Sequence, residues 1–360
     1  MQWKLSQEQD AYRKTLRKWL SVVAPSAEVR RWFAAGDASA FESRFVADGW
    51  AGAGLSEDLG GQGGGLVELA LTAEELARAA APSAAWLATV LAAPALADRG
   101  RVAASALAGE GAALLVPAET VPDRASPLTV DADGAVSGAA PLVLAGDTAA
   151  WFVVPAGVGA DGASGIRELR LVESGARGVG RTRRRLLDRS RSVADVTLDR
   201  AASVRLEADP AEVLRLASAR AAVLVAADSL GATTRMLDMA VEYSKQRRQF
   251  GVPIGSFQAV KHAAATIEVG IEAARSAVYL AAASVAAGDP RAPLHAAAVK
   301  AQVTAEGARA ADSALTMHGA IGYTWEHDLH LFFKRARLDE KLFGSPAVWN
   351  ERIAEGLALV

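Results

Sequence analysis

The chain contains no cysteine among its 360 residues. Disulfides, thiolate metal sites and cysteine nucleophiles are therefore excluded. This absence fits a reducing compartment, and we expect the protein in the cytoplasm. The chain also lacks a large excess of one charge sign, because the formal net charge is −2 and acidic and basic residues are interspersed. A nucleic-acid binder needs a one-sided basic field, so nucleic acid is not expected as a partner.

Long apolar segments are scarce, and none is typical of a membrane span. Residues 79–97 have no charged side chain, but the segment is mostly alanine and is interrupted by Pro82 and Pro94. Both features make insertion into a bilayer costly. We predict a buried helical hairpin here and no membrane partner. The first twenty residues carry charges throughout and lack the apolar core of a signal peptide, so an amphipathic helix is expected there.

Hydrophobic periodicity divides the chain into three parts. Apolar residues recur every three or four positions through the first hundred-odd residues, which predicts helices. From about residue 111 to about residue 206, short apolar or alternating runs are typical of strands, with Asp133-Gly134 as a hairpin turn. Helical patterns return after Pro210. We therefore predict a mainly α fold with a central β domain and a final helical bundle. The expected domains are 1–110, 111–208 and 209–360, and the expected C-terminal helices are 211–249, 256–287, 292–317, 327–342 and a short one from about 346.

Three features have simpler explanations than a ligand site. The glycines of residues 59–65 do not fit the GxGxxG pattern, because the third falls on Leu66, so a loop between helices is expected. The arginines of residues 177–191 lie among strands, where a solvated rim or a set of salt bridges is the default. No known metal-ligand spacing joins the histidines near the C-terminus, so no metal site is predicted. These are His318, His327 and His330, the last two expected on one helical face.

The strongest local signal is EYSKQRRQFGVPIGSFQAVKH, residues 242–262. We expect one long helix to end at Gly251 and the next to open with Gln258 in its first turn. Arg247 and Phe250, three positions apart, would then share one face of the first helix. An arginine, the free N–H groups of a helix start and a nearby amide suit a pyrophosphate or an adenine-bearing cofactor. A helical hairpin of this composition also occurs as a purely structural element.

With all its intervals kept, this segment resembles YxxxRxxFGxxIxxFQ, the hallmark of the acyl-CoA dehydrogenase family. Residues 317–329 are similar to that family's Gly-Gly-x-Gly-(Tyr/Phe) turn, and residues 53–78 to its Pro-Glu-x-Gly-Gly segment. The resemblance covers essentially the whole chain. It implies an N-terminal helical domain, a middle β-barrel-like domain and a C-terminal four-helix bundle. The matching hallmark positions are Tyr243, Arg247, Phe250, Gly251, Ile254, Phe257 and Gln258.

The resemblance also implies an FAD enzyme that desaturates acyl-CoA thioesters between the α and β carbons. A glutamate removes the α proton while the β hydrogen leaves as hydride to the flavin. Arg247, Phe250 and Gln258 would contact the diphosphate and adenosine part of FAD bound by a neighbouring subunit. A second turn would pack on the adenosine half from another subunit, which implies an obligate oligomer. That turn contains Thr316, Gly319 and Ala320, and Ala320 replaces the usual second glycine.

The family's base is missing from this chain. The segment that usually reads Tyr-Glu-Gly-Thr is Leu-Phe-Gly-Ser here, so Phe343 occupies the position of the glutamate. Some members place the base on an earlier helix, about ten residues ahead of a glycine that matches Gly231, and that position is Ala221. Glu340 lies one turn before Phe343, where we expect an exposed helix end rather than a substitute base.

The middle domain also lacks segments that the family uses at its active site. The Thr-Glu-Pro-x-x-Gly-Ser-Asp stretch that lines the flavin and acyl pocket is not recognisable, and only PAETVPD, residues 117–123, stands nearby. The residues that shield the flavin ring are replaced by Val143-Leu144-Ala145. The chain therefore keeps the half that grips the ADP part of a flavin and loses much of the half that holds the reactive ring.

This pattern resembles the smaller, glutamate-less subunits of actinobacterial heteromeric acyl-CoA dehydrogenases, some of which act on steroid side chains linked to CoA. The leading hypothesis is a subunit that contributes to FAD binding and assembly, while a homologous partner supplies the glutamate in an α2β2 complex. The further partners would be an acyl-CoA and an electron-transfer flavoprotein or similar acceptor. Two alternatives stay open: an independently active homo-oligomer with an atypical base, and a scaffold that binds no flavin.

Overall fold

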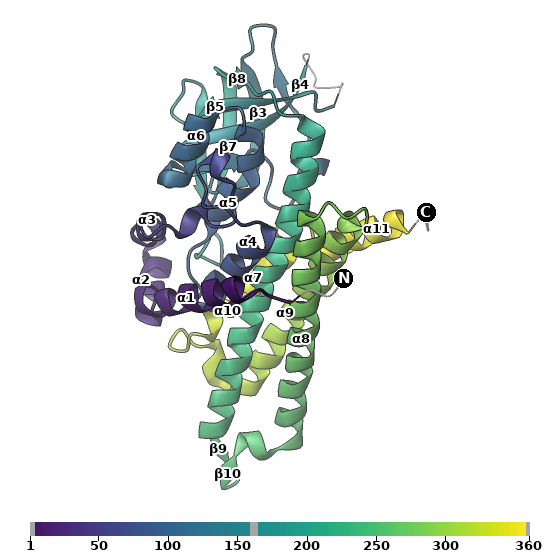
Figure 1. The fold of residues 1–360 in the computed structure, drawn as a ribbon. Helices are drawn as coiled ribbons and strands as arrows, with labels where there is room; N and C mark the ends of the chain where they lie inside the picture. Colours follow the sequence, from purple (N-terminus) through teal and green to yellow (C-terminus); the bar gives the residue numbers. More distant parts are fainter. Residues whose placement is uncertain (1–3, 159–164, 358–360) are drawn as a thin grey trace. The chain divides into compact units, whose positions relative to one another are not determined.

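The computed structural model describes residues 4–158 and 165–357. These residues form two compact units (Figure 1). The first unit contains the residues up to 31, residues 66–81 and the residues from 222 on. The second contains residues 32–65 and 82–221. The predicted domain limits at residues 110 and 208 stay a prediction.

The N-terminal part is helical, as its periodicity predicts. The first helix begins with a capping box, in which the Ser6 hydroxyl accepts from the Gln9 N–H (3.2 Å) and the Gln9 amide oxygen accepts from the Ser6 N–H (3.0 Å). The expected loop at residues 59–65 is also present. There a Cβ on Gly61 would lie 2.3 Å from the Leu55 carbonyl oxygen, so only glycine fits. The helices are α1 Gln7–Val23, α2 Ser26–Ala35, α3 Ser39–Ala47, α4 Leu66–Arg78, α5 Ala84–Ala92 and α6 Gly100–Ser105.

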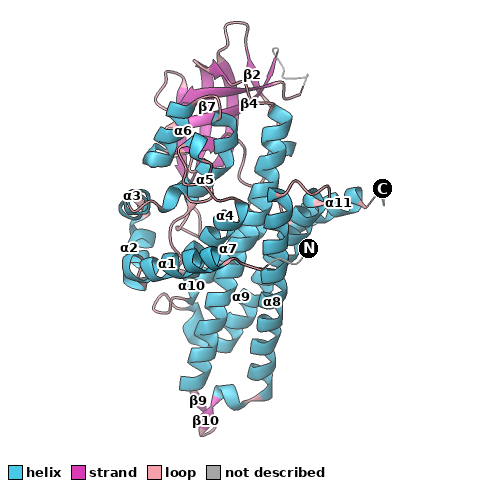
Figure 2. Cartoon of the chain, viewed as in Figure 1, coloured by secondary structure: helices cyan, strands magenta, loops and turns pink. Residues whose placement is uncertain are grey.

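The strands collect in one sheet of the second unit, drawn in magenta in Figure 2. The order runs β6-β7-β3-β2-β4-β5-β8, and β1 pairs in parallel with β4. β2 and β3 form the antiparallel hairpin predicted around Asp133-Gly134, where Gly134 has φ +82°. The strands are β1 Ala112–Leu114, β2 Leu128–Val130, β3 Val136–Leu144, β4 Trp151–Val158, β5 Glu168–Glu173, β6 Val179–Arg184, β7 Val193–Ala201 and β8 Val204–Arg205.

The C-terminal part is again helical, and the predicted mainly α fold with a central β domain is confirmed. α8 packs against α4 and α9, and α9 also packs against α10 and α11 (Figure 1). Alanine-rich faces allow this close packing, and most of α9 is buried. The helices are α7 Pro210–Gln246, α8 Gln258–Ala286, α9 Ala292–His318, α10 Leu329–Lys341 and α11 Pro346–Gly356.

A fully buried ion pair joins α10 to α7 in the first unit. The Arg335 guanidinium donates to both Asp228 carboxylate oxygens (2.7 and 2.6 Å) and to the Ala81 carbonyl oxygen (2.7 Å). Arg335 is completely buried. Because the charges are paired and hydrogen-bonded, the loss of either partner would leave an uncompensated charge in the core.

Two predicted helix limits are wrong. α7 ends at Gln246 rather than at Gly251, because the following residues form a two-stranded hairpin, β9 Arg248–Gln249 with β10 Val252–Pro253. α10 begins at Leu329, so His327 precedes the helix and does not share a helical face with His330.

Among the described residues, one helix is long and apolar enough to cross a membrane by length and composition. This is α8, whose best window has a mean hydropathy of 1.2 and is 39% buried. Residues 83–96, inside the charge-free segment, are almost entirely buried, as predicted. The predicted helical hairpin is wrong, because α5 continues directly into the short helix η3 Ala93–Leu96.

Candidate functional site

The hallmark residues lie at the end of α7, in the β9–β10 hairpin and at the start of α8 (Figure 1). The hairpin turn is Phe250-Gly251, and both residues have positive φ, +51° and +81°. A phenylalanine in the left-handed region is strained, and such strain often accompanies function. The Phe250 side chain is 93% exposed, and its ring meets the Phe257 ring edge to face at 6.2 Å.

The polar hallmark groups have no partners within the part of the chain that the structure describes. Neither the Arg247 guanidinium nor the Gln258 amide has a hydrogen bond or an ion pair to residues 4–158 or 165–357, and both side chains are exposed. Gln258 is the first residue of α8, where backbone N–H groups point outward without helical acceptors. A free guanidinium, an amide, a helix start and an exposed ring fit a diphosphate with an attached aromatic base.

The second predicted flavin segment is the turn after α9. Thr316 is exposed, and its hydroxyl donates to the Asp312 carbonyl oxygen (2.9 Å). Gly319 ends α9 with φ +62°, and Ala320 lies exposed in the short helix η7 Gly319–Tyr323. A Cβ on Gly319 would meet no atom within 4 Å, so its backbone alone requires glycine.

A stack of three rings joins these two segments. The Tyr243 ring, one turn before Arg247, lies on the His318 ring with centroids 5.0 Å apart. The His327 ring then meets His318 at 4.6 Å. Burial lowers the pKa of both histidines, and the neighbouring His318 lowers that of His327 further. The structure therefore brings together rings that are 75 positions apart in the chain, and no local pattern predicts this pairing.

The position of the family's glutamate lies in the turn between α10 and α11. Phe343 is only 4% exposed and has φ +54°, again in the left-handed region. The Trp349 indole nitrogen donates to the Phe343 carbonyl oxygen (2.9 Å), and Trp349 is itself buried. The turn is therefore an ordered part of the core with a phenyl ring where the base would be.

A buried lysine that sequence reasoning missed holds the same turn. The Lys300 amine, on α9, donates to the carbonyl oxygens of Asp339 (3.1 Å) and Gly344 (2.8 Å). Burial lowers the pKa of Lys300 to about 7, and the Asp339 carboxylate opposes this shift. The available signal was its place on the apolar face of α9, in line with Ala296 and Thr304.

Of the two alternative base positions, only Glu340 carries a carboxylate. Ala221 is fully buried, and its neighbour Arg220 donates to the Val90 carbonyl oxygen (3.2 Å). Burial lowers the pKa of Arg220 to about 10. Glu340 is half-buried and lies 3.9 Å from the Arg337 guanidinium on the same helix. Glu340 thus lies at the helix end, as predicted, but is not fully exposed, and the prediction that it is not a substitute base stays a prediction.

The arginine cluster of residues 177–191 forms salt bridges at a sheet edge, one of the two forms expected. Arg183 pairs with Asp147 (3.1 Å), and Arg184 pairs with Asp195 (2.8 Å). Within residues 4–158 and 165–357, no group of three or more histidine or acidic side chains is arranged to hold a metal ion.

Comparisons with known proteins agree with the hallmark. Residues 6–104 match the acyl-CoA dehydrogenase N-terminal domain, and residues 213–358 match the acyl-CoA dehydrogenase C-terminal domain. The chain is 35% identical to acyl-CoA dehydrogenase IpdE2 of Mycobacterium tuberculosis over 298 residues, 81% of this chain and 78% of that protein. It is 33% identical to acyl-CoA dehydrogenase FadE34 of the same organism over 97% of this chain but 48% of that protein.

Solved structures show the same relationship. The ChsE4-ChsE5 complex from Mycobacterium tuberculosis contains a chain that superimposes with a TM-score of 0.84 at 26% identity, over the full length of both chains. Because the domain matches together cover more than half of the sequence and IpdE2 is similar over most of it, the chain belongs to the acyl-CoA dehydrogenase family.

Proposed function

We propose that this chain is the base-less subunit of a heteromeric, FAD-dependent acyl-CoA dehydrogenase. It contributes contacts to the ADP half of the flavin and to assembly, and a homologous partner subunit supplies the catalytic glutamate. The complex desaturates an acyl-CoA thioester between the α and β carbons. Arg247, Phe250 and Gln258 from one segment, with Thr316, Gly319 and Ala320 from the other, are the proposed flavin contacts.

The observation that carries the proposal is the turn at Phe343. Its phenyl ring cannot take a proton, yet the turn is anchored by Lys300 and Trp349. The hallmark groups at Arg247 and Gln258, by contrast, are exposed and unpaired within the described residues. Exposed, unpaired groups that suit a diphosphate, together with an ordered turn that lacks the glutamate, support a chain that binds flavin but leaves proton abstraction to a partner.

The proteins to which the chain is similar support a paired arrangement. ChsE4-ChsE5 is a complex of two differently named chains. FadE34 is about twice as long as this chain, since 97% of the chain matches only 48% of it. The remaining half of that relative is long enough to hold a second dehydrogenase-sized segment. We therefore propose an α2β2 complex in the cytoplasm.

The chemistry divides naturally between two such subunits. A bound flavin would supply hydride-accepting chemistry for the β hydrogen, and a carboxylate of the partner would take the α proton. In this chain, the Arg247 guanidinium would neutralise diphosphate charge, and the N–H groups at the start of α8 would donate to the same oxygens. The substrate would be an acyl-CoA, with a steroid side-chain ester as the specific proposal, and an electron-transfer flavoprotein or similar protein would reoxidise the flavin.

The test compares the chain purified alone with the chain co-purified with a base-bearing homologue. We expect a flavin spectrum and acyl-CoA turnover only in the pair, as a four-chain species with fewer flavins than chains. A lone chain that forms a flavin-loaded homo-oligomer and desaturates an acyl-CoA would refute the proposal. A pair that assembles without flavin would favour the scaffold alternative.

Matched variants separate cofactor binding from folding. Arg247→Ala should lower the flavin content of the pair without preventing its assembly. Arg291→Ala is the control and should leave flavin content unchanged, because Arg291 is exposed and pairs with nearby Asp289. Phe343→Glu restores the family's residue, and we expect no activity from the lone chain, because the partner's half of the site is still absent.

A further inference from the structure

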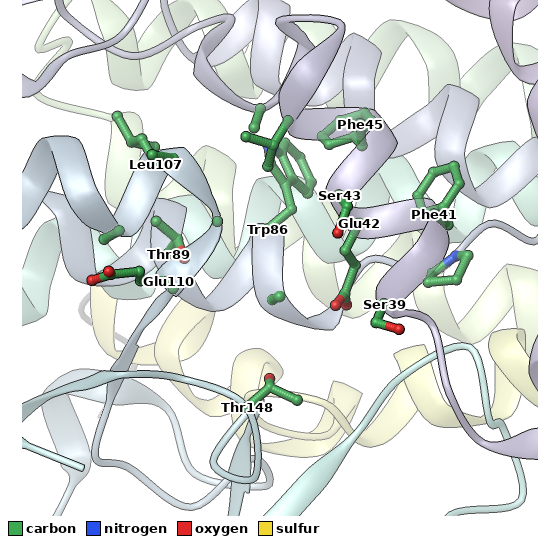
Figure 3. Close-up of a pocket in the computed structure, with 18 of the residues that line it drawn as sticks. Ser39, Phe41, Glu42, Ser43, Phe45, Trp86, Thr89, Leu107, Glu110 and Thr148 are labelled. Atoms are coloured by element: carbon green, nitrogen blue, oxygen red, sulfur yellow. The ribbon is translucent and has the colours of Figure 1, made fainter. Parts of the chain in front are cut away.

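A cavity of about 550 Å³ lies within the second unit (Figure 3). Its walls are α3, α5, the π-helical segment η4 Ala106–Glu110, and Thr148 in the connection between β3 and β4. Its volume lies within the range of small-molecule sites, roughly 300 to 1,000 Å³. None of its lining residues belongs to the segments proposed to contact the flavin.

Most of the wall is apolar and aromatic. Phe41 and Phe45 stack on the same face of α3 with ring centroids 5.7 Å apart. Trp86 and Leu107 contribute from α5 and η4 (Figure 3). Such a wall favours an apolar ligand, because binding removes the hydrocarbon of the ligand and of the wall from water.

One carboxylate in this apolar wall lacks a partner. The carboxylate of Glu42, on α3, makes no hydrogen bond or ion pair to any residue that the structure describes. Burial raises the pKa of Glu42 to about 6, and repulsion by Asp147 and Asp37 adds to the shift, whereas Arg183 opposes it. Figure 3 shows its carboxylate turned toward the space that also holds Thr148. A partly desolvated acceptor of this kind gains from a hydrogen-bond donor on a ligand.

A buried donor in the same cavity is also unsatisfied. The Trp86 side chain is 9% exposed, and its indole N–H has no acceptor among the described residues. A buried donor that makes no hydrogen bond destabilises the folded protein. Such groups are rare in native proteins, and a ligand atom that accepts from the indole would remove the cost.

The third wall has an irregular backbone. η4 is a π-helical turn that contains Gly109 at φ +111°, outside helical values, and Gly111 follows at φ +72°. The backbone therefore kinks between α6 and β1, at two glycines whose conformations other residues rarely adopt. The irregularity here borders the cavity rather than the solvent alone.

We propose that this cavity binds a largely apolar alcohol, whose hydroxyl donates to Glu42 and accepts from the Trp86 indole N–H. A hydroxyl group is the simplest head group with both a donor and acceptor sites, so one group satisfies both side chains. A carboxylate head is disfavoured by like charge, and an ether lacks the donor. This site is independent of the proposed flavin role.

The binding test uses three ten-carbon probes in isothermal titration calorimetry with the full chain near neutral pH. The probes are 1-decanol, decanoate and decyl methyl ether. We expect 1-decanol to bind roughly tenfold more tightly than either of the others. Equal binding of all three probes would refute recognition by a hydroxyl group, and no detectable binding of 1-decanol would refute the site.

Variants locate the binding. Glu42→Gln should reduce the preference for 1-decanol over decanoate to less than about threefold, because the like-charge repulsion is gone. Glu207→Gln, an exposed carboxylate outside the cavity, is the matched control and should leave the preference intact. Trp86→Phe keeps the ring and removes the N–H, so 1-decanol should bind severalfold more weakly.

A filling variant tests the place of binding. Ala85 lines the cavity from α5, and Ala85→Phe should abolish 1-decanol binding. Wild-type affinity in this variant would place the probe elsewhere and overturn the proposal. If the larger ring prevents folding, Glu42→Gln and Trp86→Phe still decide the question, because wild-type selectivity in both would be a refutation.

Discussion

The amine of Lys300 is fully buried between the carbonyl oxygens of Asp339 and Gly344. A neutral amine has two N–H groups, which match these two acceptors, whereas the charged form has a third. Burial lowers the pKa of Lys300 from 10.5 to about 7. Lys300→Met removes this titration from a turn that is otherwise kept, so the variant should lose one specific part of the pH dependence of stability.

The sign follows from proton binding. Between the folded pKa and the unfolded value near 10.5, the unfolded chain binds more protons at this residue than the folded chain, so stability rises with pH. The loss of stability caused by burying Lys300 is close to its maximum at about pH 7. It shrinks by about 2 kcal/mol on going to about pH 9. With the entropy typical of 360 unfolding residues, about 0.8 kcal/mol per kelvin, this corresponds to about 3 °C in Tm.

The assay is thermal unfolding of wild type and Lys300→Met at several pH values from about 7 to about 9. The difference in Tm between the two proteins should move by about 3 °C in favour of wild type as pH rises. Lys261→Met, at an exposed position on α8, is the control and should show a constant difference. A wild-type-minus-Lys300→Met difference that stays constant across this range would show that Lys300 is not desolvated in the way described.

Two further predictions concern the first unit. Asp228→Asn leaves the Arg335 guanidinium without its counter-charge in the core and should destabilise the protein by roughly 3 to 5 kcal/mol, measured by denaturant unfolding; a cost below about 1 kcal/mol would mean that water reaches the pair. Burial lowers the pKa of His318, so stability should fall as pH drops below its unfolded pKa, and His318→Phe should reduce that loss in Tm measurements on the acid side. An identical acid loss in His318→Phe would contradict the second prediction.

The segment around Arg247 shows what local sequence patterns can predict and what they miss. Residue identities and spacing were enough to recognise the hallmark, but the helix was predicted to continue to Gly251. In the structure it stops at Gln246, because Phe250-Gly251 form a two-residue hairpin turn with positive φ at both positions. The sequence signal for such a turn is a pair of residues that favour positive φ, and here only Gly251 is of that type. Helical periodicity alone therefore did not predict the turn. Arg247 therefore lies just before the hairpin and Phe250 at its tip, and they do not share a helical face.

Side chains whose environment comes from distant segments were not predictable. Lys300 reads as one polar residue in an alanine-rich helix until α10 and its following turn bury it. Glu42 reads as a charged residue of a short amphipathic helix, although Asp147 from a different part of the chain contributes to its shifted pKa. The ring pair of His318 and His327 likewise depends on how the turn after α9 folds back.

The sequence by itself determined the order of helices and strands, the family hallmark and the absence of a glutamate at position 343, because each depends on residue identity and short-range spacing. Only the tertiary structure decided which polar groups are paired, which are left free, and where the wall of the second unit encloses a cavity. Burial and electrostatic shifts arise when segments far apart in the chain exclude water from one another, and no local pattern records that.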